Sequence, residues 1–147
     1  MIDQEATLQE EFEITGGDFI NGGSASCRIK NILKDIGVDA EIIRRVAIAS
    51  YEAEMNIVMY AKKGIMRFFL TPKKILIKVN DEGPGIRDIE LAMQPGYSTA
   101  TTEMREMGFG AGMGLPNIRK NADKFNIQSA VNKGTQLEIE INLNSKK

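Results

Sequence analysis

The chain has 147 residues and a formal net charge of −1, values that suit a single domain over residues 1–147. Its 19 basic and 20 acidic residues lack the basic excess of a general nucleic-acid binder. Histidine is absent, which excludes Ser-His and Cys-His pairs and histidine-ligated zinc, so any general base must be a carboxylate, a lysine or a tyrosine. The single cysteine, Cys27, excludes an internal disulfide, favours a cytoplasmic location and is expected to be buried or half-buried. No apolar stretch reaches the roughly 18 residues of a membrane span, and no signal peptide is expected.

The first half of the chain predicts one strand, two helices and two further strands. Gly37 is placed to end the first helix as its C-cap, and Asp39 is a good N-cap for the second. The second helix is apolar nearly all round from Val46 to Ala61, so it is expected to be buried, and Gly64 is expected to end it. The predicted elements are a strand over 8–15, helices over 19–36 and 40–62, and strands over 65–70 and 74–79.

The second half predicts a short helix over 86–93, a loop, a helix over 113–124 and a closing hairpin over 125–131 and 135–143. The loop, 94–107, is poor in apolar residues, and a structureless stretch of that length in a compact domain is usually functional or disordered, so we expect it to be mobile. Because the strands come in consecutive pairs, the sequence predicts an α+β fold. Its sheet is expected to be mixed but mostly antiparallel, with helices on one face.

Two polar residues interrupt the apolar second helix. Glu52 and Asn56 are spaced i and i+4, so they lie on one helix face with Cβ atoms about 5–6 Å apart. Glu54 points nearly the opposite way from Glu52, so it can be solvated while Glu52 and Asn56 face a pocket. One interpretation makes Glu52 a general base and Asn56 a ligand of Mg²⁺, which prefers oxygen and usually takes one or two protein side chains. The other is an internal hydrogen bond that satisfies the pair within the fold.

A glycine turn, Asp81-x-Gly83-x-Gly85, follows the strand over 74–79. Such a turn permits close approach of the backbone to a ligand or to another segment. A simple turn is one interpretation. In the other, the Asp81 carboxylate accepts a hydrogen bond from the exocyclic amine of adenine, because guanine carries a keto oxygen at the corresponding ring position.

A second glycine-rich segment, from Gly108 to Gly114, has glycine at every second position and leads into a helix. Backbone of this kind presents N–H groups and the positive end of the helix dipole to phosphate. No clear strand precedes the segment, and no Gly-Lys-Ser/Thr follows a glycine run, so neither a dinucleotide-binding turn nor a Walker A loop is indicated. A flexible linker is the alternative. Arg105, just before these glycines, is either a solvated charge or a clamp on a terminal phosphate.

In combination, these segments resemble the boxes of the GHKL ATPase superfamily, which has the Bergerat nucleotide-binding fold, an α/β sandwich. The resemblance covers almost the whole chain. The small size, without dimerisation helices or a second domain, is similar to the branch of bacterial anti-sigma factors and switch serine/threonine kinases. Tyr60 stands where many relatives have histidine, and extra residues around 100–107 depart from the shorter lid of the switch kinase. The matching segments are Glu52-x-x-x-Asn56 for the N box, Asp81-x-Gly83-x-Gly85 for G1, Gly108 to Leu115 for G2 and Gly134-Thr135 for the last box.

The resemblance implies bound ATP with Mg²⁺ and a role for each box. Glu52 would activate a protein serine hydroxyl or water, and Asn56 would coordinate the metal. Asp81 would bind the adenine amine, with Thr135 supporting the same contact through water. Residues 94–113 would form a mobile ATP lid, and Arg105 would act as a catalytic contact to the γ-phosphate. The other residues expected at the nucleotide are Gly83, Gly85, Ile86, Gly108, Gly110, Gly112, Met113, Gly114 and Leu115.

The resemblance also implies a function: an ATP-dependent serine/threonine protein kinase that acts as an anti-sigma factor or partner-switching regulator. Its substrate would be a serine on an antagonist protein of the STAS type; a sigma factor and a homodimer are further candidate partners, and no direct nucleic-acid or membrane partner is expected. Two alternatives stay open, a non-catalytic module in which ATP only gates partner binding, and a simple ATPase or histidine-kinase fragment. The intact Glu52 favours a kinase over the module, and the absence of histidine weakens the fragment.

Overall fold

The computed structural model describes residues 6–86, 89–94 and 114–143. The order of elements is the predicted one, although the helix predicted over 86–93 is described only as a short turn of helix, and the predicted lid beyond Gln94 lies outside the described residues. The elements are β1 (Leu8–Thr15), α2 (Ser24–Ile36), α3 (Ala40–Tyr60), β2 (Lys63–Leu70), β3 (Lys74–Asp81), α4 (Ile89–Ala92), α6 (Gly114–Asn121), β4 (Lys124–Ala130) and β5 (Gly134–Asn142).

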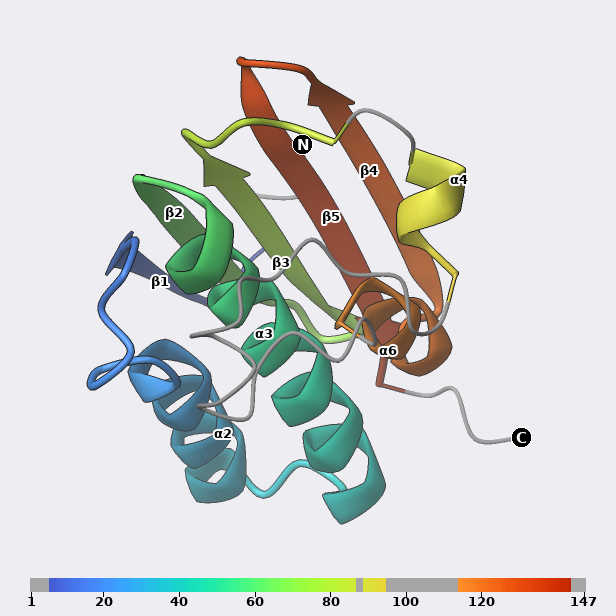
Figure 1. The fold of residues 1–147 in the computed structure, drawn as a ribbon. Coiled ribbons are helices and arrows are strands. Elements are labelled where there is room, and N and C mark those ends of the chain that lie inside the picture. The colour runs from blue at the N-terminus through green and yellow to red at the C-terminus, as the bar shows by residue number, and fades with distance from the viewer. Residues whose placement is uncertain (1–5, 87–88, 95–113, 144–147) are drawn as a thin grey trace.

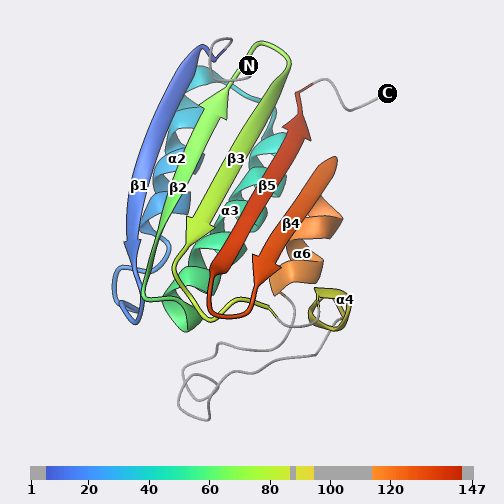
Figure 2. The same cartoon turned by 90° about the horizontal axis from the view of Figure 1, so that it is seen from above.

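The strands form one open sheet in the order β1-β2-β3-β5-β4. Each of the four pairings between described strands is antiparallel, so the mostly antiparallel prediction is confirmed. Helices α2, α3 and α6 lie together behind the sheet in Figure 2, which confirms the α+β prediction with helices on one face. In Figure 1, α3 runs across the centre of that face with α2 on one side and α6 on the other. The end of β3 therefore lies beside the start of β5, close to the C-terminal half of α3.

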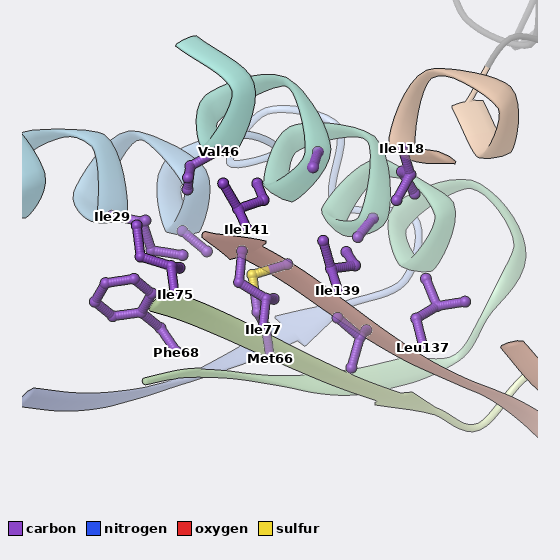
Figure 3. Packing of buried hydrophobic residues seen from close by; sticks show 14 of the residues in the cluster. Ile29, Val46, Met66, Phe68, Ile75, Ile77, Ile118, Leu137, Ile139 and Ile141 are labelled. Atoms are coloured by element: carbon purple, nitrogen blue, oxygen red, sulfur yellow. The ribbon is translucent and has the colours of Figure 1, made fainter. Parts of the chain in front are cut away.

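The core lies between the sheet and these helices, as Figure 3 shows. In β5, Ile139 and Ile141 are fully buried, and the residues between and beside them are exposed or half-buried. Ile29 of α2, Val46 of α3 and Ile118 of α6 oppose the sheet from the helices. Full burial of such a side chain stabilises a fold by about 1.5–3 kcal/mol. The alternation along β5 therefore decides which of its faces meets the helices.

Helix α2 begins at Ser24 rather than at residue 19, because residues 19–23 form turns. Gly23 takes a φ of 100°, a left-handed conformation that interrupts a helix and that glycine adopts at little cost. At the other end the predicted C-cap is confirmed: Gly37 has a φ of 91°, and its N–H donates to the carbonyl oxygens of Leu33 and Lys34.

Helix α3 is buried along most of its length, as predicted. Its predicted N-cap is also confirmed, because the Asp39 carboxylate accepts the N–H of Glu41 at 3.2 Å. The helix ends at Tyr60, with Ala61 as a C-cap in extended conformation. The prediction that Gly64 ends it is wrong: Gly64 lies inside β2, buried against α3.

The structure tests two expectations drawn from the composition, the burial of Cys27 and the lack of a membrane span. Cys27 is exposed on the outer side of α2, so the prediction of a buried or half-buried thiol is wrong. The neighbouring positions 25, 26 and 29 take the buried side of that helix. Among the described residues, no helix combines the length and the apolar content needed to cross a bilayer.

Candidate active site

The C-terminal half of α3 presents Glu52 and Asn56 toward the start of α6. Both side chains are half-buried. The side-chain amide of Asn117 in α6 donates a hydrogen bond from Nδ2 to Glu52 Oε2 at 3.2 Å. Helix α6 starts at Gly114, where an added Cβ would lie 3.3 Å from Glu52 Oε1 and 3.7 Å from Asn56 Oδ1. The carboxylate, the amide oxygen and the first turn of α6 therefore meet, and among the described residues the side chain that donates to Glu52 is Asn117 rather than Asn56.

Glu54 points away from this junction, as predicted, but it is not solvated: only 1% of it is exposed. Its carboxylate accepts three backbone N–H groups, those of Gly23 at 3.0 Å, Ala25 at 3.1 Å and Ser26 at 2.9 Å. These groups belong to the start of α2, where helical N–H groups lack partners within their own helix. A carboxylate from α3 therefore caps α2, at the end where the helix dipole favours an anion.

Asp81 ends β3 and is half-buried beside β5. Its Oδ1 accepts the backbone N–H of Thr135 at 3.1 Å, so two residues predicted to share a ligand do lie together. Burial raises the pKa of Asp81 above its ordinary 3.8, and the backbone hydrogen bonds from Thr135 and Gly83 oppose that rise. An ionised carboxylate offers about four acceptor positions. Asp81 is thus held at the sheet end with acceptor capacity left for a ligand amine.

Two glycines let the turn after β3 touch the hairpin between β4 and β5. Gly85 has a φ of 78°, and an added Cβ would collide with the carbonyl oxygen of Ala130. Gly134 has a φ of 88°, and an added Cβ would collide with the carbonyl oxygen of Asp81. Glycine is the residue that combines this backbone conformation with such close approach. The close packing of the turn against the hairpin therefore explains why Gly85 and Gly134 are glycines. It is compatible with a simple turn and with an adenine-binding turn.

Ser129 of β4 connects the same segments and was not predicted as a site residue. Its Oγ accepts the N–H of Ile86 at 2.7 Å and lies 3.0 Å from the carbonyl oxygen of Gly134 and 2.9 Å from Thr135 Oγ1. A hydroxyl supplies one donor and two acceptors, which suits this position between three polar groups. The signal that finds it is the hairpin register, in which Ser129 lies opposite Thr135.

The predicted phosphate-binding residues are only partly described. Gly114 faces Glu52, whereas Leu115 is 8% exposed and packs into the core, so its side chain is not placed to meet a ligand. The predictions for the lid lie outside the described residues; they concern Arg105, Gly108, Gly110, Gly112 and Met113.

The side-chain oxygens at the junction of α3 and α6 suit a metal ion whose other ligands are mostly substrate phosphates and water. Within the described ranges, no group of three or more acidic, histidine or cysteine residues forms a metal site by itself. Mg²⁺ commonly keeps several waters and binds one or two protein oxygens together with substrate phosphates. The amide oxygen of Asn56, which would lie 3.7 Å from a Cβ added at Gly114, fits that pattern as a single protein ligand.

A polar face of α3 set against the start of α6, over one side of an antiparallel sheet, is the arrangement of a GHKL-type ATPase domain. The chain belongs to the histidine kinase-like ATPase domain family, whose model matches residues 24–141. It is 31% identical over 113 residues to the serine/threonine-protein kinase RsbT of Bacillus subtilis strain 168, which covers 74% of this chain and 79% of RsbT. It is 39% identical over 104 residues to the anti-sigma F factor of Caldanaerobacter subterraneus subsp. tengcongensis, covering 67% of this chain and 69% of that factor.

Solved structures share the fold at low identity. A chain of the SiaB–SiaC complex of Pseudomonas aeruginosa matches with a TM-score of 0.56 and 10% identity, covering 95% of this chain and 92% of the other. The solved structure of the RsbU and RsbW domains of Rv1364c from Mycobacterium tuberculosis matches over part of its chain, with a TM-score of 0.57 and 16% identity, covering 90% of this chain and 32% of that longer one. The predicted superfamily, with its anti-sigma and switch-kinase branch, is confirmed.

Proposed function

We propose that this chain is an ATP-dependent serine/threonine protein kinase in a partner-switching module. The observation that carries the proposal is the position of Glu52, a helix-borne carboxylate beside Asn56 and the first turn of α6. The homology to RsbT, named a serine/threonine-protein kinase, and to anti-sigma F factors supports the same reaction class. A protein that only binds ATP has no use for a carboxylate at that place.

Each end of the site has a proposed role toward ATP. The Asp81 carboxylate accepts the exocyclic amine of adenine, and the Thr135 hydroxyl contributes to the same contact through water. The site end at α6 holds the phosphates, because the N–H groups and dipole of a helix start attract anions. Mg²⁺ held by Asn56 would neutralise phosphate charge when bound. The lid residues, with Arg105 at the γ-phosphate, complete the proposal.

The proposed chemical step is a direct transfer. A serine hydroxyl oxygen of the partner forms a bond to the γ-phosphorus, while the bond from that phosphorus to the bridging oxygen breaks and ADP leaves. The hydroxyl proton passes to the carboxylate of Glu52. In such transfers, positioning and charge stabilisation supply most of the acceleration, and a placed general base adds about 10²- to 10⁴-fold.

A protein partner of the STAS type is the proposed substrate. The relatives carry the name anti-sigma factor, and SiaB was solved in complex with the protein SiaC, so both point to recognition of another protein. A sigma factor as a second partner and a homodimer as the active form are parts of the same proposal. A cytoplasmic location is part of the proposal, and the single cysteine, which suits a reducing compartment, supports it.

The test is phosphoryl transfer from radiolabelled ATP with Mg²⁺ to a candidate STAS-domain protein. Glu52→Gln removes the base with little change in shape, and Glu138→Gln is a matched control because Glu138 is exposed on β5. We expect serine phosphate with the parent and with Glu138→Gln, and at least a 100-fold lower rate with Glu52→Gln at unchanged ATP affinity.

Other outcomes separate the alternatives. ATP-dependent partner binding without transfer would establish the non-catalytic module, and release of free phosphate without labelled protein would establish a simple ATPase. Full transfer activity in Glu52→Gln would refute the assignment of the base while leaving the kinase reaction in place.

A further inference from the structure

Asn117 was not predicted as a site residue, yet its side chain contacts the proposed base, Glu52. It lies one turn into α6, half-buried, and its Nδ2 donates to Glu52 Oε2 at 3.2 Å across the gap between the two helices. Its own backbone carbonyl accepts Asn121 Nδ2 at 2.8 Å, which ties the next turn of the helix to it. The side-chain amide is therefore carried on an ordered helix rather than on a loop.

The Glu52 carboxylate is enclosed by α6 at both oxygens. Oε2 receives the Asn117 amide, and Oε1 faces Gly114, where even a Cβ would come within 3.3 Å. A glutamate side chain has three rotatable bonds, so without a partner it samples several orientations of its carboxylate. A donor at a set position selects one orientation, and that selection leaves Oε1 as the oxygen turned to the start of α6.

We propose that Asn117 is a positioning residue for Glu52: it holds one carboxylate oxygen so that the other is presented to the incoming hydroxyl. This inference rests on the proposed kinase function. An amide is well suited to the task, because it donates a hydrogen bond but takes no part in proton exchange. The proton in the transfer step goes from the serine hydroxyl to Glu52, and Asn117 keeps both of its own hydrogens.

The structure offers a matched contact between the same two helices that does not touch Glu52. Arg45, near the start of α3, donates from Nε to the carbonyl oxygen of Asn121 at 3.0 Å and pairs with Asp123 at 3.2 Å. Loss of that contact loosens the far end of α6 without changing the carboxylate. If Asn117 mattered only for docking α6 onto α3, variants at Asn117 and at Arg45 would act alike.

The first experiment compares steady-state transfer kinetics of three variants. In Asn117→Leu the donor is lost at similar size, and we expect kcat to fall about 10- to 100-fold, with KM for ATP within twofold of the parent. In Asn117→Gln the amide donor is kept, and we expect kcat within about fivefold of the parent. In Arg45→Met we expect a lower melting temperature and kcat within twofold. Equal losses in Asn117→Leu and Arg45→Met, or parental kcat in Asn117→Leu, would overturn the positioning role.

The second experiment needs no activity, so it separates this inference from the proposed function. In the ¹H–¹⁵N NMR spectrum of the protein without partner, the Asn117 side-chain amide signals should shift and exchange faster with solvent in Glu52→Ala, and remain near their parental positions in Glu138→Ala. Unmoved Asn117 signals in Glu52→Ala would show that the contact does not exist in solution and would refute the inference. A parent that shows the contact but never labels a partner refutes the kinase function instead.

Discussion

Replacement of Glu54 by alanine should destabilise the domain far more than replacement of Glu52, although both are glutamates on α3. Glu54 is 1% exposed and accepts three backbone N–H groups from the start of α2. In Glu54→Ala those groups lose their acceptor, and a cavity replaces a fully buried side chain. In Glu52→Ala, a half-buried side chain loses the hydrogen bond from Asn117.

The size of the loss in the free energy of unfolding depends on which of the N–H groups can reach water once the carboxylate is removed. The bonds from Ala25 and Ser26 are buried, whereas that from Gly23 is only partly buried. A buried donor left without a partner costs about 1–3 kcal/mol, and the Gly23 N–H can be solvated once the carboxylate is gone. We therefore expect about 4 kcal/mol for Glu54→Ala and about 1 kcal/mol or less for Glu52→Ala. A domain of this size is stable by about 5–15 kcal/mol, so the first value corresponds to a fall in melting temperature of about 10 °C.

Urea unfolding followed by circular dichroism measures both free energies of unfolding. Glu54→Gln refines the test, because the amide keeps one acceptor oxygen but turns an NH₂ donor toward backbone donors; its loss should lie between those of the parent and Glu54→Ala. A difference below about 1 kcal/mol between Glu54→Ala and Glu52→Ala would refute the capping argument.

Three further predictions concern the glycine turn and Asp81. Asp81→Asn keeps an oxygen for the Thr135 N–H but loses the carboxylate offered to adenine, so we expect the fold to persist and ATP affinity to fall at least 10-fold by calorimetry; equal affinity would contradict the adenine role. Because burial raises the pKa of Asp81, its contribution to stability is full below 3.8 and is lost as the pH rises through the raised value. Asp81→Asn should therefore gain stability relative to the parent between pH 4 and pH 7 in urea unfolding, and a constant difference would contradict the burial argument. Gly85→Ala, with a φ of 78° and a collision with Ala130, should cost more stability than Gly17→Ala, where φ is 81° and no heavy atom lies within 4 Å; equal melting temperatures would show that the close approach does not matter.

The parts of the site that could be predicted from the sequence are those set by local geometry. Glu52 and Asn56 share a helix face because they are four residues apart, whatever the rest of the fold does. The turn after β3 follows from the spacing of Gly83 and Gly85 beyond Asp81, since glycine is the residue that tolerates such turns. Those predictions needed the element type and nothing else.

The contacts that could not be predicted depend on which elements become neighbours. Asn117 meets Glu52 across 65 positions of sequence, and Ser129 meets Ile86 across 43. The wrong prediction for Glu54 has the same origin, because a helical pattern gives the direction of its side chain but not what lies there. The later start of α2 has a local cause instead, the left-handed backbone at Gly23. Carboxylates are usually solvated, but that of Glu54 is buried because the N–H groups at the start of α2, distant in sequence, satisfy it instead of water.

The burial of Glu54 also explains why Glu52 points where it does. Residues two apart on a helix are separated by about 200° around its axis, so a side chain fixed on one side sets the other. The three N–H groups at the start of α2 hold Glu54 on the side of α3 that faces α2. Any rotation of α3 that turned Glu52 away from α6 would pull that carboxylate off its donors and leave a buried charge, at a cost of about 3–5 kcal/mol. The two glutamates of α3 thus have different roles. Buried Glu54 fixes the rotation of the helix about its axis, and that rotation directs half-buried Glu52, together with Asn56, toward the start of α6.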